Sequence, residues 1–210
     1  MDFVALDIET ANADGESICE IGLVKFQQGI EVDSWSSTIR PKSSPELLPM
    51  NFSLHGISQE EILAAPYLQD LWGKISKFVA GLPIVAHGAT QDISKLLKSA
   101  QLDIEPHWEF PSDAYSCSLV LSRRSPSLFP VNFSLRSIAE VLEIESPDIE
   151  RNGMRVHSAE SDARACGLIA LSLARTSGVE SLEELSKILD VHMGTISNKE
   201  ISRRAVSRSE

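Results

Sequence analysis

Short apolar runs and amphipathic stretches alternate along most of this chain. Residues 3–6 are an uninterrupted apolar run that stops at an acidic stretch, which is typical of a buried strand whose carboxyl end turns polar. Residues 18–27 and 30–39 are predicted to form two further strands, joined by a turn at Gln28-Gly29. Because these strands follow one another so closely, we expect them to pair antiparallel.

Helices are predicted where apolar residues recur every three or four positions. Ser58 and Glu61 have the spacing of a capping box, so a short helix is expected to begin there and to end at Pro66. Further helices are expected at residues 68–81, from residue 90, and at residues 116–123, 134–142, 158–174 and 181–189. Strands are also expected at residues 82–86 and near Phe110, and loops at residues 41–49 and 148–156. This order predicts an α/β fold in which a mixed sheet, antiparallel and then parallel, is flanked by helices.

The length and composition fit one main domain with an extension. The chain has 210 residues, of which 42% are hydrophobic, and this is enough for one well-filled core. We expect a domain over residues 1–177 and a C-terminal extension over residues 178–210, made of a helix capped by Ser181 and a basic tail. The apolar stripe of that helix needs a partner, which is either a larger protein or the chain's own domain.

Charge and cysteine content restrict how the protein could bind nucleic acid and in which compartment it is expected. The net charge is −11, from 30 acidic and 19 basic residues, which argues against binding nucleic acid through a broad basic surface. No apolar run approaches the ~18 residues of a membrane span, and the N-terminus has no signal-peptide pattern. The three widely spaced cysteines indicate neither a disulfide framework nor a metal site, so we expect a cytoplasmic protein with no membrane partner.

Carboxylates follow two of the predicted buried strands. Asp7 and Glu9 end the first strand, and positions i and i+2 of a strand point to the same face. Two such carboxylates repel each other unless they are solvated, paired or bridged by a divalent cation, which prefers carboxylate oxygens. Asp92 follows the strand at residues 82–86, at the kind of position where ligands gather in α/β sheets. Taken alone, the first pair is equally a solvated strand end, and Asp92 an acid that complements a helix dipole.

His157 and Asp162 lie at the start of the last long helix of the predicted domain. Five positions are ~140° around a helix of 3.6 residues per turn, so His157 is better placed in the loop that enters the helix. From there its imidazole would stand beside a metal ion held by Asp162. An isolated pair of this kind is more often a surface histidine and a solvated acid. The pattern gains its weight from the combination of three acidic segments with one loop histidine.

In this order, the segments resemble the three motifs of the DEDD exonuclease superfamily, in its histidine-containing, DnaQ-like branch. The motifs correspond to FVALDIET followed by CEIGLV, to IVAHGATQD and to HSAESDA, and HGIS resembles a family segment between the first two. Gly88 and Gln91 depart from the Asn and Phe that are common in the second motif. The resemblance covers residues 3–174 and implies a ribonuclease H-like fold and a 3′→5′ exonuclease, similar to bacterial proofreading subunits and ribonuclease T-like enzymes.

The resemblance also implies a metal-ion mechanism. Two Mg²⁺ or Mn²⁺ ions would be held by four carboxylates, those of Asp7, Glu9, Asp92 and Asp162. These ions would activate a water molecule and stabilise the leaving 3′ oxygen, so that nucleoside 5′-monophosphates are released from the 3′ end of a strand. His157 would be the general base that takes the proton of that water, a task that its ordinary pKa of ~6.5 suits.

Three residues are expected to border the terminal nucleotide in a protein of this family. Thr10 would donate a hydrogen bond to the 3′ end through its backbone or its hydroxyl. His55 would either contact the strand or cap the helix that begins near Ser58. Ile57 would either offer an apolar face to a base or belong to the core.

The expected substrate is a single-stranded or frayed DNA 3′ end, as in proofreading or repair, and the extension is a possible contact with a polymerase or another protein. RNA trimming is the nearest alternative, because the same residues serve both sugars. A binding module that has lost catalysis also stays open, although the intact set of five residues argues against it. A metal-dependent hydrolase of small phosphate esters is the third alternative.

Overall fold

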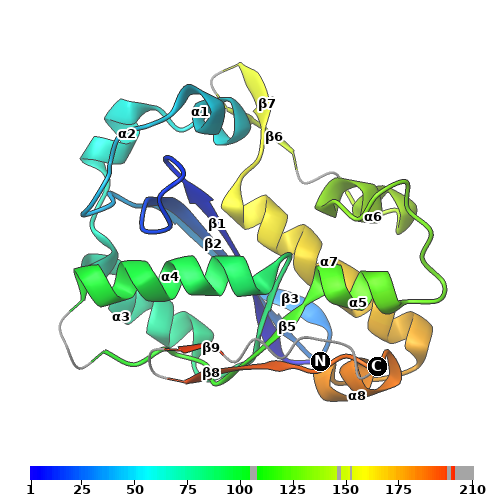
Figure 1. The fold of residues 1–210 in the computed structure, drawn as a ribbon. Helices are drawn as coiled ribbons and strands as arrows, with labels where there is room; N and C mark the ends of the chain where they lie inside the picture. The colour runs from blue at the N-terminus through cyan, green and yellow to red at the C-terminus, as the bar shows by residue number, and fades with distance from the viewer. Residues whose placement is uncertain (105–107, 146–147, 152, 198–199, 202–210) are drawn as a thin grey trace.

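The fold is built on a mixed seven-stranded sheet (Figure 1). Strands β1, β4 and β5 are parallel to one another, and the other adjacent strands of the sheet pair antiparallel. The strands, in spatial order, are β3 (Ile30–Thr38), β2 (Ile18–Gln27), β1 (Phe3–Thr10), β4 (Ile84–Ala86), β5 (Ala114–Cys117), β8 (Gly194–Ser197) and β9 (Glu200–Ile201). This computed structural model describes residues 1–104, 108–145, 148–151, 153–197 and 200–201. The predicted α/β fold with a mixed sheet is confirmed.

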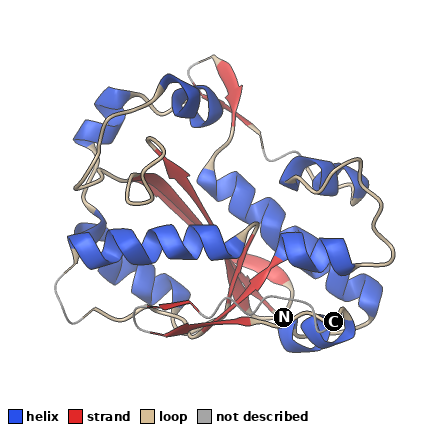
Figure 2. Ribbon diagram, in the orientation of Figure 1, coloured by secondary structure: helices blue, strands red, loops and turns tan. Residues whose placement is uncertain are grey.

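Helices cover both faces of this sheet (Figure 2). One face carries α3 (Leu68–Val79) and α4 (Ala89–Asp103), and the other carries α7 (Ala159–Ser177). The remaining helices are α1 (Pro49–His55), α2 (Gln59–Ala64), α5 (Ser118–Arg124), α6 (Leu135–Val141) and α8 (Leu182–Ile188). In the described residues, no helix is both long and apolar enough to cross a membrane.

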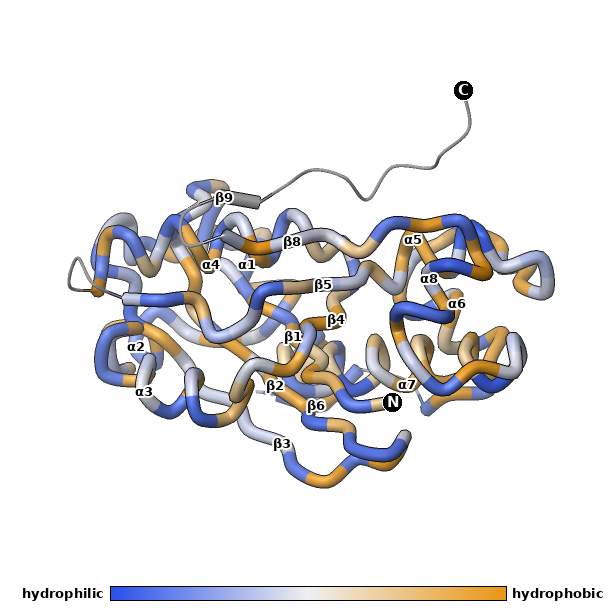
Figure 3. Tube along the Cα trace, turned by 90° about the horizontal axis from the view of Figure 1, so that it is seen from below, coloured by the Kyte–Doolittle hydropathy of each residue, from blue (hydrophilic) through white to orange (hydrophobic). Residues whose placement is uncertain are grey.

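The alternation of side chains along β1 decides what each face of the sheet holds. Val4 and Leu6 are buried in the core with α3 and α4, whereas Phe3 and Ala5 are buried in the core with α7. Coloured by hydropathy, the strands at the centre of the sheet are largely apolar (Figure 3). Asp7 is the next residue on the α7 side, because side chains two positions apart on a strand share a face. The first acidic segment therefore faces α7.

Several predicted boundaries are wrong. The stretch at residues 41–49 was expected to be loop up to its end, but α1 begins at Pro49, where proline suits the first helical turn. The strand expected near Phe110 lies further along, at β5. Phe110 instead packs its ring against that of Trp72, with 6.1 Å between the ring centroids. Phe110 is a buried apolar residue of a loop, and its apolar character was mistaken for that of a strand.

The loop predicted at residues 148–156 is in fact a short hairpin. Its strands are β6 (Ile149–Arg151) and β7 (Met154–Val156), which pair antiparallel and leave Gly153 in the turn with a φ of 74°. Three residues are too few to show the two-residue period by which a strand is recognised in a sequence.

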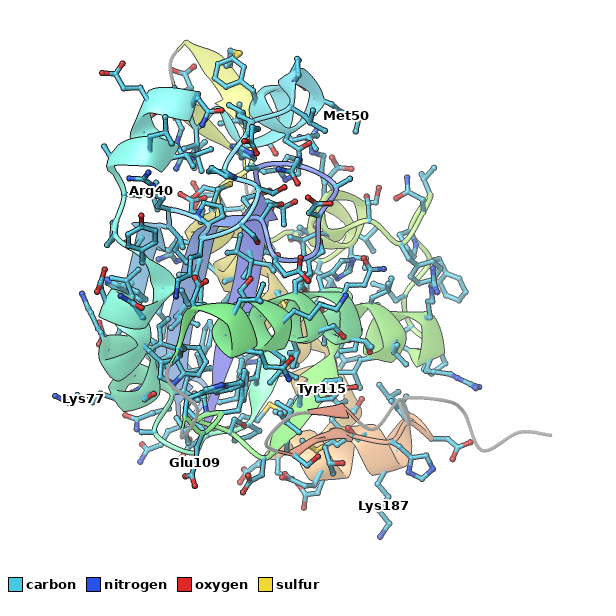
Figure 4. All side chains as sticks on the ribbon, turned by 60° about the vertical axis from the view of Figure 1, so that its left-hand side comes forward. Arg40, Met50, Lys77, Glu109, Tyr115 and Lys187 are labelled. Carbon is cyan, nitrogen blue, oxygen red and sulfur yellow. The ribbon has the colours of Figure 1, made fainter. Side chains whose placement is uncertain are left out.

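The chain beyond Gly178 contributes to the same cores and the same sheet. Leu182 is buried in the core with α7, and Leu185 is buried among residues of α5, α6 and α7. β8 pairs with β5 beside Tyr115 (Figure 4), where a Cβ atom on Gly194 would lie 2.0 Å from the tyrosine ring. The helix of the extension therefore packs on the chain's own domain. The arginines of the basic tail lie outside the described residues: Arg203, Arg204 and Arg208.

Removing residues 179–210 is expected to unfold or aggregate the domain. Five buried apolar side chains would be lost, and each contributes ~1.5–3 kcal/mol, which together matches the ~5–15 kcal/mol of a typical domain's stability. They are Leu182, Leu185, Leu189, Val191 and Ile196. Size-exclusion chromatography and thermal unfolding measure the effect, with Ile188→Ala as a control because Ile188 is 57% exposed. A truncated monomer that unfolds within a few degrees of the full chain would contradict the prediction.

Candidate active site

Three carboxylates meet where β1 ends and α7 begins. Ligand oxygens of Asp7, Glu9 and Asp162 all lie within 4.8 Å of one another, close enough to hold a metal ion together. Asp162 comes from the first turn of α7 and is buried. The structure thus brings together the first and third acidic segments predicted from the sequence.

Asp92 approaches this cluster from α4, the helix that follows β4, and β4 is a neighbour of β1 in the sheet. Asp92 lies in the first turn of that helix, which begins at Ala89, directly after the N-cap Gly88 with its φ of 91°. Asp92 does not belong to the group of three, but its charge raises the pKa of Asp7. Burial raises the pKa of Asp92 itself to about 7.

Burial and mutual repulsion make these carboxylates hard to ionise without a cation. Burial, followed by the charges of Asp92 and Asp162, raises the pKa of Asp7 well above its usual value. The pKa of Glu9 rises to about 8, chiefly through burial and then through the charge of Asp162. Within the described part of the chain, Asp92 Oδ2 and Asp162 Oδ1 are buried without a hydrogen-bond partner. A divalent cation satisfies such oxygens and removes the repulsion between them. These carboxylates are therefore suited to bind a divalent cation.

A glycine lets α7 lie directly on the sheet at this point. Gly22 pairs with Asp7 across β1 and β2, and a Cβ atom on it would lie 2.1 Å from the carbonyl carbon of Ala159. No side chain fits in that space, so the first turn of α7 rests against the backbone of β2. This close approach carries Asp162 to the carboxylates of β1.

His157 lies in the loop between β7 and α7, where the helical geometry predicted it. Its Nδ1 lies 2.9 Å from Asp162 Oδ2, and its side chain is 39% exposed. The hydrogen bond to Asp162 raises the pKa of His157. Its backbone N–H donates to the carbonyl oxygen of Leu54 at 2.8 Å, which ties the loop to α1. The imidazole therefore stands at the partly open side of the cluster.

The three residues expected at the terminal nucleotide differ in exposure. Thr10 is half-buried at the end of β1, and Asn51 Nδ2 donates to its carbonyl oxygen at 2.7 Å. His55 is fully buried, its Nδ1 accepts from the N–H of Ile57 at 3.1 Å, and burial lowers its pKa to about 4. Ile57 is 1% exposed and packs in a core cluster with Cys19. Of the two roles left open for Ile57, its burial favours the core. His55 does not cap α2, because Ser58 does so, and it bonds the N–H of Ile57 instead.

Two further charged side chains lie beside the cluster, and neither was given a role from the sequence. Glu20 Oε1 accepts from Arg151 Nη2 at 2.7 Å, and Glu20 Oε2 accepts from the N–H of Ala159 at 3.0 Å. Glu20 was noticed only as part of a family segment. Arg151 gave no signal, because its partner lies 131 positions away along the chain.

Known proteins match this chain over most of its length. Residues 4–170 match the model of the RNase_T exonuclease family. A PolC-type DNA polymerase III from Thermotoga maritima is 30% identical over 193 residues, which are 90% of this chain and 13% of that protein. The chain thus spans only a small part of the length of this curated relative.

Solved structures share its fold. A full-length 3′-exonuclease is 17% identical with a TM-score of 0.72, over 100% of this chain and 92% of the other. The nuclease domain of 3′hExo, a DEDDh family member bound to rAMP, is 20% identical with a TM-score of 0.62, over 85% and 94% of the two chains. The DnaQ-like resemblance drawn from the motifs is confirmed, and the chain belongs to the RNase_T exonuclease family.

Proposed function

We propose that this protein is a divalent-metal-dependent exonuclease that removes nucleoside 5′-monophosphates from the 3′ ends of single-stranded or frayed DNA. The observation that carries the proposal is the cluster of Asp7, Glu9 and Asp162 with His157 bonded to its edge. In a chain of the RNase_T exonuclease family, this set matches the needs of phosphodiester hydrolysis. The similarity to a DNA polymerase favours DNA as the substrate.

The carboxylates, His157 and Thr10 would have different roles in the reaction. Two Mg²⁺ or Mn²⁺ ions bound by the four carboxylates would supply an acidified water and neutralise charge at the scissile phosphate. Asp162 holds His157 through Nδ1, which leaves the other ring nitrogen to take the proton of the attacking water. Thr10, at the end of β1, would donate to the 3′ end of the strand. His55 and Ile57 support this region from beneath the surface.

RNA trimming is the second candidate function. The nuclease domain of 3′hExo, which shares the fold, was solved with rAMP. The carboxylates and the histidine act on the phosphate and the water, so they would serve either sugar.

We also propose that the chain works in the cytoplasm, with or as part of a polymerase. One relative that it matches is a polymerase of which this chain spans 13%. The three cysteines are buried and unpaired, which agrees with a reducing compartment. The extension is the segment that we expect to contact such a partner.

A gel assay on 5′-labelled DNA and RNA of matched sequence tests the activity. We expect a ladder that shortens from the 3′ end with Mn²⁺ and is absent with EDTA, faster on DNA than on RNA. Intact strands, from a folded protein that binds Mn²⁺, would contradict the proposal and favour a binding module. Turnover of a chromogenic phosphodiester without cleavage of either strand would instead indicate a hydrolase of small phosphate esters.

A further inference from the structure

A further acid, Glu20, shares the face of the sheet that carries Asp7 and Glu9. Glu20 pairs with Glu9 across β1 and β2, and directly opposed residues of an antiparallel pair point to the same side. Its side chain is 4% exposed, and its charge raises the pKa of both Asp7 and Glu9. Glu20 nevertheless lies outside the group whose oxygens could share one metal ion.

Arg151 is one of two groups that bond the carboxylate of Glu20. Its Nη2 bonds one oxygen of Glu20 at 2.7 Å, while the N–H of Ala159 bonds the other oxygen at 3.0 Å. Its Nη1 donates to the carbonyl oxygen of His55 at 2.7 Å. One guanidinium fork therefore joins β6, β2 and the last residue of α1, and it pairs with an acid whose charge acts on Asp7 and Glu9.

The same contacts hold the hairpin that leads into His157. Arg151 ends β6, and His157 directly follows Val156, the last residue of β7. The hairpin is seated against Gly56, where a Cβ atom would lie 3.4 Å from Val156 and 3.5 Å from Arg151. The N–H of His157 bonds the carbonyl of Leu54, so the hairpin is attached to the end of α1 at two points. In Figure 1 the hairpin lies beside α1 and runs directly into α7.

We propose that Arg151 is a positioning residue of the exonuclease reaction: it fixes the hairpin that presents His157 and keeps Glu20 turned away from Asp7 and Glu9. This inference rests on the proposed function of the same site. Without the guanidinium, a buried carboxylate would be left with only one of its two partners beside three like charges. The hairpin would also lose one of its two attachments to α1, and His157 would lose its fixed place at the cluster.

Steady-state kinetics on 5′-labelled single-stranded DNA with Mn²⁺ test the proposal. We expect Arg151→Met to lower kcat by ~10–100-fold and to change KM by less than ~3-fold, as for groups that orient catalytic ligands. Arg151→Lys keeps the charge without the fork, so we expect it to fold and to lose ~3–10-fold in kcat. Arg175→Met is the matched control, because Arg175 is exposed in the last turn of α7, at the end of the helix opposite Asp162; we expect its kcat to be unchanged.

Amide hydrogen exchange of the metal-free protein gives a readout that needs no activity. In Arg151→Lys and Arg151→Met, we expect the amide of His157 to exchange ~10-fold faster, with the amide of Leu23 in β2 unchanged. Equal acceleration at both amides, or a kcat of Arg151→Lys within twofold of the wild type, would overturn the proposal. If the wild-type chain shortens no strand, the proposed function fails, whereas the exchange at His157 still decides whether Arg151 holds the hairpin.

Discussion

Replacing Asp7 by asparagine is expected to lower the exonuclease rate by ~10³-fold or more, which corresponds to ~4 kcal/mol of transition-state stabilisation. The oxygens of Asp7 belong to the group that could hold one metal ion, and the charges of Asp92, Asp162 and Glu9 all raise its pKa. An amide is nearly the same size but carries no charge, and it would weaken the hold on divalent cations. Initial rates on 5′-labelled DNA with Mn²⁺ measure the loss. Asp33→Asn removes the same charge from an exposed position on β3 and should leave the rate unchanged.

The same substitution is expected to stabilise the metal-free protein. Carboxyl groups whose pKa is raised on folding contribute stability below their ordinary pKa of ~4, and that contribution is lost as pH rises through the raised value. The stability that Glu9 contributes is lost as pH rises through its pKa of about 8. The contribution of Asp92 is lost as pH rises through its pKa of about 7. Metal-free wild-type protein should therefore become less stable from pH 5 to pH 8, and Asp7→Asn should lose less over that range.

Mn²⁺ should reverse this loss in the wild-type chain. It stabilises ionised carboxylates, so we expect it to raise the wild-type Tm by ~5 °C or more at pH 8, given ~2–4 °C per kcal/mol, and by less at pH 5.5. The gain should disappear in Asp7→Asn and persist in Asp33→Asn. Equal Mn²⁺ gains in the wild type and in Asp7→Asn, or a wild-type rate in Asp7→Asn, would show that Asp7 holds no metal.

The positions of Asp7, Glu9 and His157 in their strand and loop could be predicted, because they depend on the local sequence. The apolar run before Asp7 forms a buried strand, and the two-residue period of that strand puts Asp7 and Glu9 on one face. The start of α7 follows from its apolar period, and the turn angle of a helix put His157 in the loop before it. Each of these inferences needs only residues within a few positions of one another.

The remainder depends on contacts between distant segments. Whether Ile57 faces a base or the core depends on packing against Cys19, which no local pattern reveals. The bond between Arg151 and Glu20 spans 131 positions, and β6 is too short to show a strand period. The apolar stripe of α8 was visible in the sequence, but its burial against the domain depends on tertiary packing.

Replacing His157 by alanine is expected to lower kcat by ~10²–10⁴-fold, the range that a general base contributes, while Mn²⁺ binding persists. His157 acts as a base only when its imidazole is neutral, and the hydrogen bond to Asp162 raises its pKa. The wild-type rate should therefore rise with pH through a midpoint above the ~6.5 of free imidazole. The residual rate of His157→Ala should lack that rise, because no group is left to titrate in this role.

Calorimetry with Mn²⁺ and pH–rate profiles separate this role from a loss of the metal site. Asp7→Asn should lose Mn²⁺ binding and activity together, whereas His157→Ala should lose activity alone. A second histidine provides the control: His192 follows α8, outside the carboxylate cluster, and His192→Gln should keep both the rate and its pH profile. A kcat of His157→Ala within tenfold of the wild type, or an unchanged pH midpoint, would assign the proton transfer to another group. In that case the bond from Nδ1 to Asp162 would orient the carboxylate, and the histidine would belong to the support of the metal site.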